Sequence, residues 1–245
     1  MCRSLLRVLP PARSTALLLA TLAACTSEPT RAPATLHFGV VQEVMRDGRT
    51  EARAALQQFT SPGWYAVGAV AGLQGEILID DGEALVARTA ATVVEPAAPG
   101  DQATLLTAAQ VPAWREFVVD RAIDLDDLPE LLLAQVPAVA SATTPLPFLV
   151  EGTMTELELH VVRGSCPHGA PKPGTQPADR WSIPVGQEAS VKLVGFFVRG
   201  QEGVMTHHGS TLHVHAHVTA PQRAMGHVDA GRFAAGVKVR VPAGS

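Results

Sequence analysis

Short apolar runs separated by glycine-containing turns constrain the fold of this chain most strongly. The stretch "GWYAVGAVAGLQGEILIDDGEALVAR", residues 63–88, consists of runs of valine, isoleucine, leucine and alanine that are broken at Gly72, Gly75 and Asp81-Gly82. An Asp-Gly pair between two apolar runs is a hairpin signal, because both residues tolerate positive φ angles. The pattern therefore predicts three strands joined by two tight turns.

The rest of the chain continues this β pattern with little helix. One helix is indicated at residues 124–136, where Asp126 or Asp127 can cap the N-terminus. Residues 36–59 show mixed helical spacing. Further strands are predicted at residues 103–112, 114–120, 147–153, 155–164, 190–198, 210–218 and 231–241. We therefore expect a β-rich α+β fold with mixed or antiparallel sheets and few helices.

The N-terminus has the layout of a secretory signal. Three arginines, Arg3, Arg7 and Arg13, precede a short apolar segment, and that segment is shorter than the ~20 residues of a membrane span. Its ending, "LAAC", resembles a bacterial lipobox, whose cysteine becomes the lipidated first residue of the mature protein. We expect a signal peptide at residues 1–24, a tether at residues 25–35 that is lipid-anchored through Cys25, and a single domain at residues 36–245. A plain cleaved signal peptide is the alternative. The expected location is the bacterial cell envelope, with the membrane contacted only through the lipid anchor.

The charge balance argues against nucleic acid as a partner. The chain has 19 basic and 23 acidic residues, a net charge of −4. Removal of residues 1–24 would make the net charge −7, because that segment holds three arginines and no acidic residue. A mildly acidic chain without a basic block does not match a nucleic-acid-binding surface. With Cys25 lipidated, only Cys166 remains in the mature chain, so we expect no intrachain disulfide.

Six of the nine histidines fall within residues 207–227. In "HVHAHV", His213, His215 and His217 alternate with apolar residues and therefore point to one face of a strand. All three are unsuited to one cation, since the outer pair is ~13 Å apart on a strand that rises ~3.3 Å per residue. Two neighbours from this strand, together with His227 after the next turn, form a donor set typical of zinc. The spacing leaves open whether the pair is His213 with His215 or His215 with His217.

The other histidines and the last cysteine are weaker candidates. His207 and His208 are expected in a loop beside the site, as supporting residues and not as ligands. His37 is expected at the surface. Cys166 and His168 could form a small metal pair, although an ordinary thiol in a proline-rich loop is the simpler interpretation.

The chain resembles the bacterial α-acetolactate decarboxylase family. "YAVGAVAGLQGEILIDDGEALVAR", "VEGTMTELELHVV" and "VGFF…HVHAHV…MGHVD" occur in the family's order and approximate spacing, loosely from Leu36 to Phe233. The resemblance implies a zinc ion held by His213, His215 and His227. It also implies that this ion binds the carbonyl and hydroxyl oxygens of 2-acetolactate and stabilises the enediolate left when CO2 departs. A cupin is the rival fold, and its ligand spacing fits poorly.

The resemblance implies two more site residues and shows two departures. Glu76 of "GLQGE" corresponds to an active-site carboxylate of the family. Eight residues after the glycine of "EGT", the family has an arginine and this chain has His160. His160 is therefore a catalytic candidate, as a cation or as a further metal ligand, but it cannot offer a guanidinium fork to a carboxylate. The family also has a glutamate near its C-terminus, whereas no acidic residue follows Asp229 here.

We therefore expect an exported, zinc-dependent decarboxylase that converts 2-acetolactate, or a related small 2-hydroxy-3-oxo acid, to acetoin. The alternatives are a metal-dependent enzyme of another reaction class and an exported metal-binding module that has lost the substrate clamp. Matching Arg223 to a family arginine would make His215 and His217 the strand ligands, but the spacing from "GFF" favours His213 with His215. The oligomeric state stays open, with a homodimer as one expectation.

Overall fold

The chain is described by a computed structural model for residues 34–140, 143–165 and 177–245. The expected signal peptide at residues 1–24 and the expected lipidation site Cys25 lie outside the described residues. The candidate pair Cys166 and His168 lies outside them as well. Within the described part of the chain, no helix has the length and hydropathy needed to cross a membrane.

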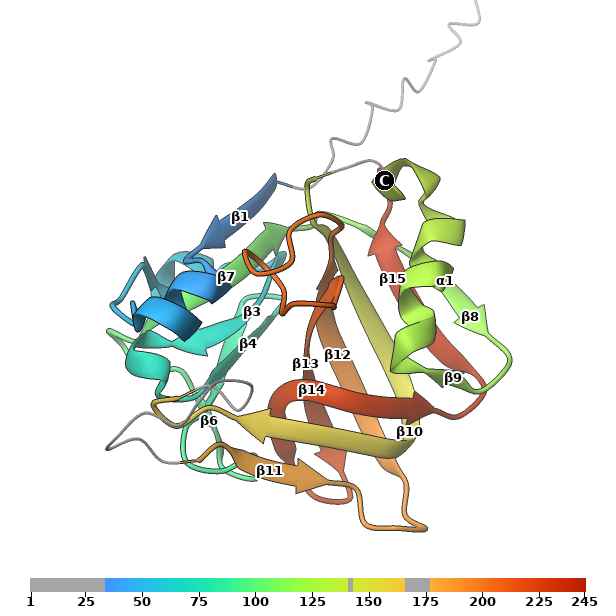
Figure 1. Ribbon diagram of the computed structural model, residues 1–245. Helices are drawn as coiled ribbons and strands as arrows, with labels where there is room; N and C mark the ends of the chain where they lie inside the picture. The colour runs from blue at the N-terminus through green and yellow to red at the C-terminus, as the bar shows by residue number, and fades with distance from the viewer. Residues whose placement is uncertain (1–33, 141–142, 166–176) are drawn as a thin grey trace, which may run out of the picture.

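The first sheet contains seven antiparallel strands: β1 (Ala34–Phe38), β2 (Ala54–Ala55), β3 (Trp64–Val70), β4 (Glu76–Asp80), β5 (Glu83–Ala87), β6 (Val94–Pro96) and β7 (Gln102–Gln110). Their order is β1-β7-β3-β4-β5-β6, with β2 also beside β7. Figure 1 shows β1, β7, β3 and β4 of this sheet side by side. The predicted hairpin between β4 and β5 is confirmed, and Asp81 and Gly82 have φ angles of 50° and 84°. Ala34 and Thr35, which we expected to end the tether, are paired with β7 as the first residues of β1.

The second sheet contains eight antiparallel strands: β8 (Trp114–Val119), β9 (Ile123–Asp124), β10 (Leu146–Val161), β11 (Asp179–Ser182), β12 (Ala189–Phe197), β13 (Leu212–Ala220), β14 (Ala224–Phe233) and β15 (Val237–Pro242). β10 pairs with β12 through its first half and with β14 through its second half. Because β12 and β14 also flank β13, the strands β10, β12, β13 and β14 close on one another. This closure holds β14, which carries His227, between β13, which carries His213 and His215, and the second half of β10 (Figure 1).

Two strand boundaries differ from the sequence prediction. Separate strands are predicted at residues 147–153 and 155–164, but a single 16-residue strand, β10, runs from Leu146 to Val161, and residues 162–164 lie beyond its end. The chain passes through Met154 without a turn, because this residue is paired with β12 on one side and β14 on the other. Conversely, the predicted strand at residues 231–241 is the end of β14, a turn through Gly236 with a φ angle of 89°, and β15.

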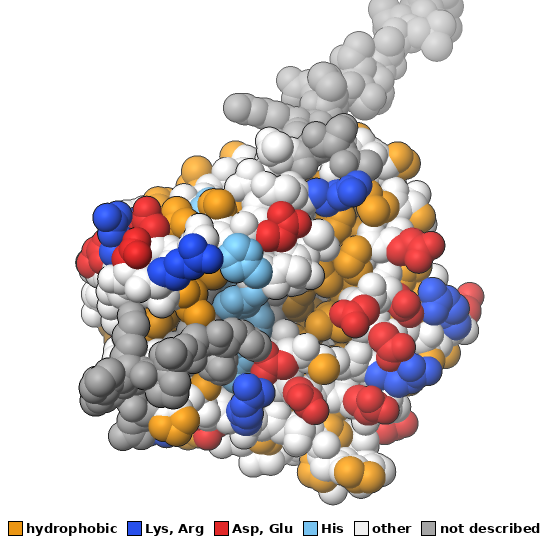
Figure 2. Space-filling view, in the orientation of Figure 1, with side chains coloured by type: hydrophobic (Ala, Val, Ile, Leu, Met, Phe, Trp, Pro, Cys, Tyr) orange, Lys and Arg blue, Asp and Glu red, His pale blue; other side chains and the backbone are white. Residues whose placement is uncertain are grey.

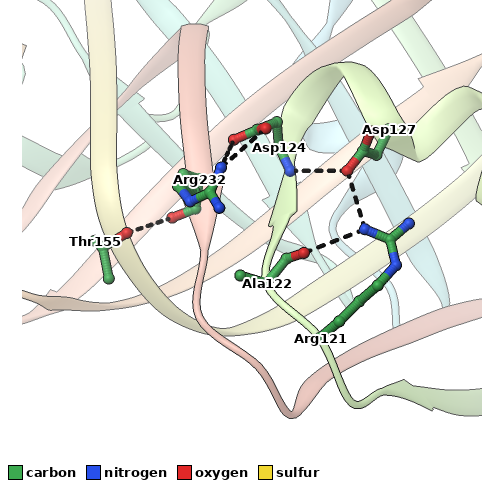
Figure 3. A network of polar contacts seen from close by, with 6 residues as sticks. All are labelled: Arg121, Ala122, Asp124, Asp127, Thr155 and Arg232. Carbon is green, nitrogen blue, oxygen red and sulfur yellow. Dashed lines mark hydrogen bonds and ion pairs between the residues drawn. The ribbon is translucent and has the colours of Figure 1, made fainter.

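The predicted helix at residues 124–136 is present but shorter. It consists of a 3-10 turn, η4 (Leu125–Asp127), and α1 (Leu128–Gln135), and a second 3-10 turn, η5 (Pro137–Ala140), follows. Asp127 takes part in capping, but as the third residue of a capping box and not as the N-cap: its carboxylate accepts the backbone N–H of Asp124 at 3.2 Å, and the Asp124 side chain accepts the backbone N–H of Asp127. Asp127 makes no side-chain cap hydrogen bond to α1 itself. Asp124 in turn accepts two hydrogen bonds of 2.8 and 3.0 Å from Arg232 of β14 (Figure 3). The helix is thus tied to the far end of β14.

Both faces of the first sheet are buried. Val67 and Leu78 contribute to the main core against the second sheet. Ile77 and Ile79 belong to a separate cluster on the opposite face, together with Phe59 of the 3-10 turn η2 (Leu56–Phe59). Successive strand residues face opposite sides, so a sheet that is buried on both sides reads as a continuous apolar run, as in "EILID".

Candidate metal centre

Histidines from three neighbouring strands lie side by side in the second sheet. His215 of β13 is paired with His227 of β14, and His227 is paired on its other side with His160 of β10. Directly paired residues of antiparallel strands project to the same face, and His213 joins that face two residues before His215. Gly226 lets β10 and β14 approach closely, because a β-carbon there would lie 2.6 Å from the carbonyl oxygen of His160. The register of three strands therefore assembles the cluster.

His213, His215 and His227 converge. One nitrogen of each lies within 4.8 Å of the others, and their ring centroids are 5.1–5.4 Å apart. Among the described residues, Nδ1 of His213 and both ring nitrogens of His215 are buried without a hydrogen-bond partner. Buried polar atoms almost always have a partner, and a bound metal ion supplies one to imidazole nitrogens. The arrangement therefore matches three imidazole donors around one metal ion.

Burial keeps these imidazoles neutral. It is the largest cause that lowers the pKa of His213 and His227 well below the ordinary value and the pKa of His215 to about 3. Repulsion from neighbouring histidines lowers the three pKa values further. A metal ion binds the neutral imidazole, so at neutral pH these side chains need to lose no proton before they can bind one.

Glu76 places a carboxyl group beside the histidines. It starts β4 directly after a turn that contains η3 (Ala71–Leu73) and Gly75, whose φ angle is 133°. Oε1 of Glu76 accepts the backbone N–H of Val162 at 3.1 Å, and Oε2 lies 3.6 Å from Nε2 of His215. Burial raises the pKa of Glu76 to about 7. This carboxyl can therefore hold or release a proton near neutral pH.

His160 stands next to the three converging histidines. Its ring centroid is 4.8 Å from that of His227, and only 2% of the residue is exposed. Nδ1 of His160 lies 2.8 Å from Oδ1 of Asp229, and Oδ2 of Asp229 lies 3.3 Å from the exposed Arg180. Asp229 is the extra residue of a β-bulge in β14, and such bulges re-aim a side chain. Sequence reasoning missed Asp229, whose only signal is its position two residues after His227.

Of the two histidine pairs considered for the metal site, one lies in the converging group. His217 lies outside the converging group, and its Nε2 accepts a hydrogen bond of 3.3 Å from Nε of Arg223. His213, at the other end of the same strand motif, lies inside the group. The fold therefore brings His213, and not His217, together with His215 and His227.

The remaining histidines are more varied than predicted. His208 is exposed in a loop, and the neighbouring His207 has its ring centroid 5.4 Å from that of His227. The surface prediction for His37 is wrong. This residue is half-buried on β1, and its Nδ1 lies 3.0 Å from Oγ1 of Thr107 on β7. Burial lowers the pKa of His37.

A pocket opens beside the cluster between the two sheets. Figure 2 shows histidine side chains gathered in the middle of this face of the molecule. Glu76, His160 and His207 contribute polar groups to the wall, and the described residues of the wall include no lysine or arginine. The hollow contains about 480 Å³ of empty space, a volume that includes solvent at its open mouth. Its apolar lining consists of Val41, Val44, Met45, Ala69, Leu73, Leu105, Val162 and Met205.

Two antiparallel sheets with three converging histidines, buried or half-buried beside a small pocket, define a class of β-rich α+β protein with a candidate metal centre. The family model for alpha-acetolactate decarboxylase matches residues 37–243, and the chain belongs to this family. The fold and the resemblance inferred from the sequence are thereby confirmed.

Solved structures show the same fold at low sequence identity. Alpha-acetolactate decarboxylase from Bacillus subtilis strain 168 is 13% identical with a TM-score of 0.65, over 84% of this chain and 85% of that chain. Acetolactate decarboxylase from B. subtilis subspecies spizizenii is 13% identical with a TM-score of 0.66, over 85% of both chains. A protein of unknown function from Staphylococcus aureus, similar to alpha-acetolactate decarboxylase, is 15% identical with a TM-score of 0.64, over 84% of both chains. No curated protein sequence matches the chain significantly.

Proposed function

We propose that this protein is a zinc-dependent decarboxylase that converts 2-acetolactate, or a related 2-hydroxy-3-oxo acid, to acetoin or its homologue. Membership of the alpha-acetolactate decarboxylase family supports this reaction class. The observation that carries the proposal is the converging group of His213, His215 and His227, in which buried ring nitrogens of His213 and His215 lack a hydrogen-bond partner among the described residues. Glu76 and His160 beside this group supply side chains that can hold a proton.

The donor set fits zinc. His213, His215 and His227 would hold the ion through neutral imidazole nitrogens, and three histidines with room for substrate are typical of catalytic zinc. A bound zinc ion would supply Lewis acidity that polarises the substrate's carbonyl group and stabilises the negative charge left when CO2 departs. The apolar pocket walls exclude water and accept the alkyl groups of the substrate.

The protein's own side chains supply the proton that the reaction needs. During decarboxylation the carbon–carbon bond to the carboxylate breaks, its electron pair stays on the substrate, and the carbon left behind must gain one proton. Burial raises the pKa of Glu76 to about 7, and its Oε1 is held by the N–H of Val162, so Oε2 is placed to donate that proton. His160 occupies the opposite side of His227 from His215 and faces the same pocket.

A second candidate function rests on one specific observation. Where the family resemblance implies an arginine, this chain has His160, and no lysine or arginine is found in the described wall of the pocket. A substrate carboxylate therefore lacks a guanidinium partner in this part of the site. This difference favours, as the alternative, a metal-dependent enzyme of another reaction class or an exported metal-binding module.

Acetoin formation separates these functions. Purified protein, stripped of metal and reloaded with Zn²⁺, is incubated with 2-acetolactate, and acetoin is measured against a blank without enzyme and against the stripped protein. We expect acetoin from the zinc-loaded protein well above both controls. A rate equal to the blank, with zinc bound at one ion per chain, would exclude the decarboxylase and leave the alternatives.

We also propose that the protein acts in the cell envelope, tethered through a lipid on Cys25. The "LAAC" ending of the apolar N-terminal segment supports this placement. The proposed partner is a small-molecule substrate, and neither a nucleic acid nor a membrane-spanning helix is part of the proposal.

A further inference from the structure

The contact between His160 and Asp229 combines three features that together point to a role in the site. His160 is buried, it forms part of the pocket wall, and its Nδ1 lies 2.8 Å from a carboxylate oxygen. Asp229 is mostly buried as well, with 13% of its side chain exposed, and it is not part of the same pocket wall. The imidazole therefore stands between the carboxylate and the pocket.

The second carboxylate oxygen is also held. Oδ2 of Asp229 lies 3.3 Å from Arg180, which is paired directly with His160 across β11 and β10. Arg180, His160 and His227 thus form one row across three strands, and Asp229 connects the first two of them. A guanidinium group only donates hydrogen bonds, so it fixes Oδ2 as an acceptor and leaves Oδ1 to face the imidazole.

We propose that Asp229 is a positioning residue that fixes the tautomer of His160. A carboxylate only accepts hydrogen bonds, so Nδ1 of the neutral His160 ring must carry the proton that it shares with Asp229. In that neutral tautomer Nε2, on the opposite side of the ring, carries no proton.

This inference rests on the proposed function for its consequence. A single tautomer gives the His160 ring one fixed proton position and one fixed orientation in the pocket wall, so every bound substrate meets the same edge of the imidazole.

Nitrogen-15 NMR of the zinc-loaded protein tests the tautomer directly, without substrate. Long-range proton–nitrogen correlations distinguish a protonated from an unprotonated ring nitrogen, and the signals missing from a His160→Gln variant identify those of His160. At a pH where the spectrum shows a neutral ring, we expect the proton on Nδ1. A neutral ring with its proton on Nε2 in the wild-type protein would overturn the proposal, and this outcome needs no variant to fold.

Asp229→Asn makes the test sharper. Arg180 can donate only to the amide oxygen, so the amide nitrogen turns toward His160 and donates to Nδ1, which moves the ring proton to Nε2. We expect kcat to fall on the order of a hundred-fold with zinc content unchanged, since Asp229 does not belong to the converging group. The matched control is Asp124→Asn, the same change at a carboxylate that binds Arg232, and it should keep both the tautomer and kcat.

The outcomes of this test separate the inference from the proposed function. An unchanged tautomer in Asp229→Asn would overturn the role of Asp229 whatever the activity is. Absence of acetoin formation in the wild-type protein would overturn the decarboxylase but not the tautomer assignment. A tautomer that changes while kcat does not would refute the positioning role in the reaction.

Discussion

Gly226→Ala should separate the two strands that carry His160 and His227. The added β-carbon would lie 2.6 Å from the carbonyl oxygen of His160, about 0.8 Å inside the range where ordinary van der Waals contact begins. The obstacle is backbone, so the strain must be relieved by moving β10 and β14 apart. Overpacking of this kind costs about 1–3 kcal/mol of the free energy of unfolding. For a chain of this size, that corresponds to a fall in Tm of roughly 2–12 °C.

The same substitution should weaken zinc binding, because Gly226 directly precedes His227. We expect the Kd for Zn²⁺, measured by competition with a chromophoric chelator, to rise on the order of ten-fold or more. Gly231→Ala is the matched control on β14, since its new β-carbon meets mainly the flexible end of the Met154 side chain. A Gly226→Ala protein with Tm within about 1 °C of wild type and unchanged Kd would refute the idea that close strand approach positions His227.

Three further predictions concern single side chains. His227→Ala should lose zinc on dialysis while His217→Ala keeps it, as measured by elemental analysis; equal zinc in both variants would remove His227 from the ligand set. Glu76→Gln should lower acetoin turnover on the order of a hundred-fold with zinc content unchanged, and full activity of this variant would show that its carboxyl handles no proton. Cys25→Ser should release the protein from the membrane fraction of the producing cells, and continued membrane association would contradict lipid anchoring.

Local signals in the sequence predict the strands but not all of their limits. The hairpin at Asp81-Gly82 is predictable because its positive φ angles are a property of those two residues. The continuity of β10 through Met154 is different, because it depends on pairing with Ala189 of β12 and Phe233 of β14, which are distant in the chain. Pairing partners of this kind cannot be predicted from the sequence of β10 itself.

Some features of the candidate site also follow from local sequence, whereas others depend on contacts between distant parts of the chain. The period of two along a strand predicts that His213 and His215 share a face, and this is a local property. The burial of His37 depends on the packing of β1 against β7, so its half-buried position could not be foreseen. The role of Asp229 depends on a β-bulge, which shifts the register between β14 and β10 by one residue and has no signal in this sequence.

The central claim is that His213, His215 and His227 bind one zinc ion. Anomalous X-ray scattering from crystals of the zinc-loaded protein, recorded on both sides of the zinc absorption edge, tests it most directly. We predict one zinc peak with a nitrogen of each of these three histidines at roughly 2.0–2.1 Å. A zinc ion bound through His217, or zinc bound elsewhere while these three side chains stay free, would contradict it.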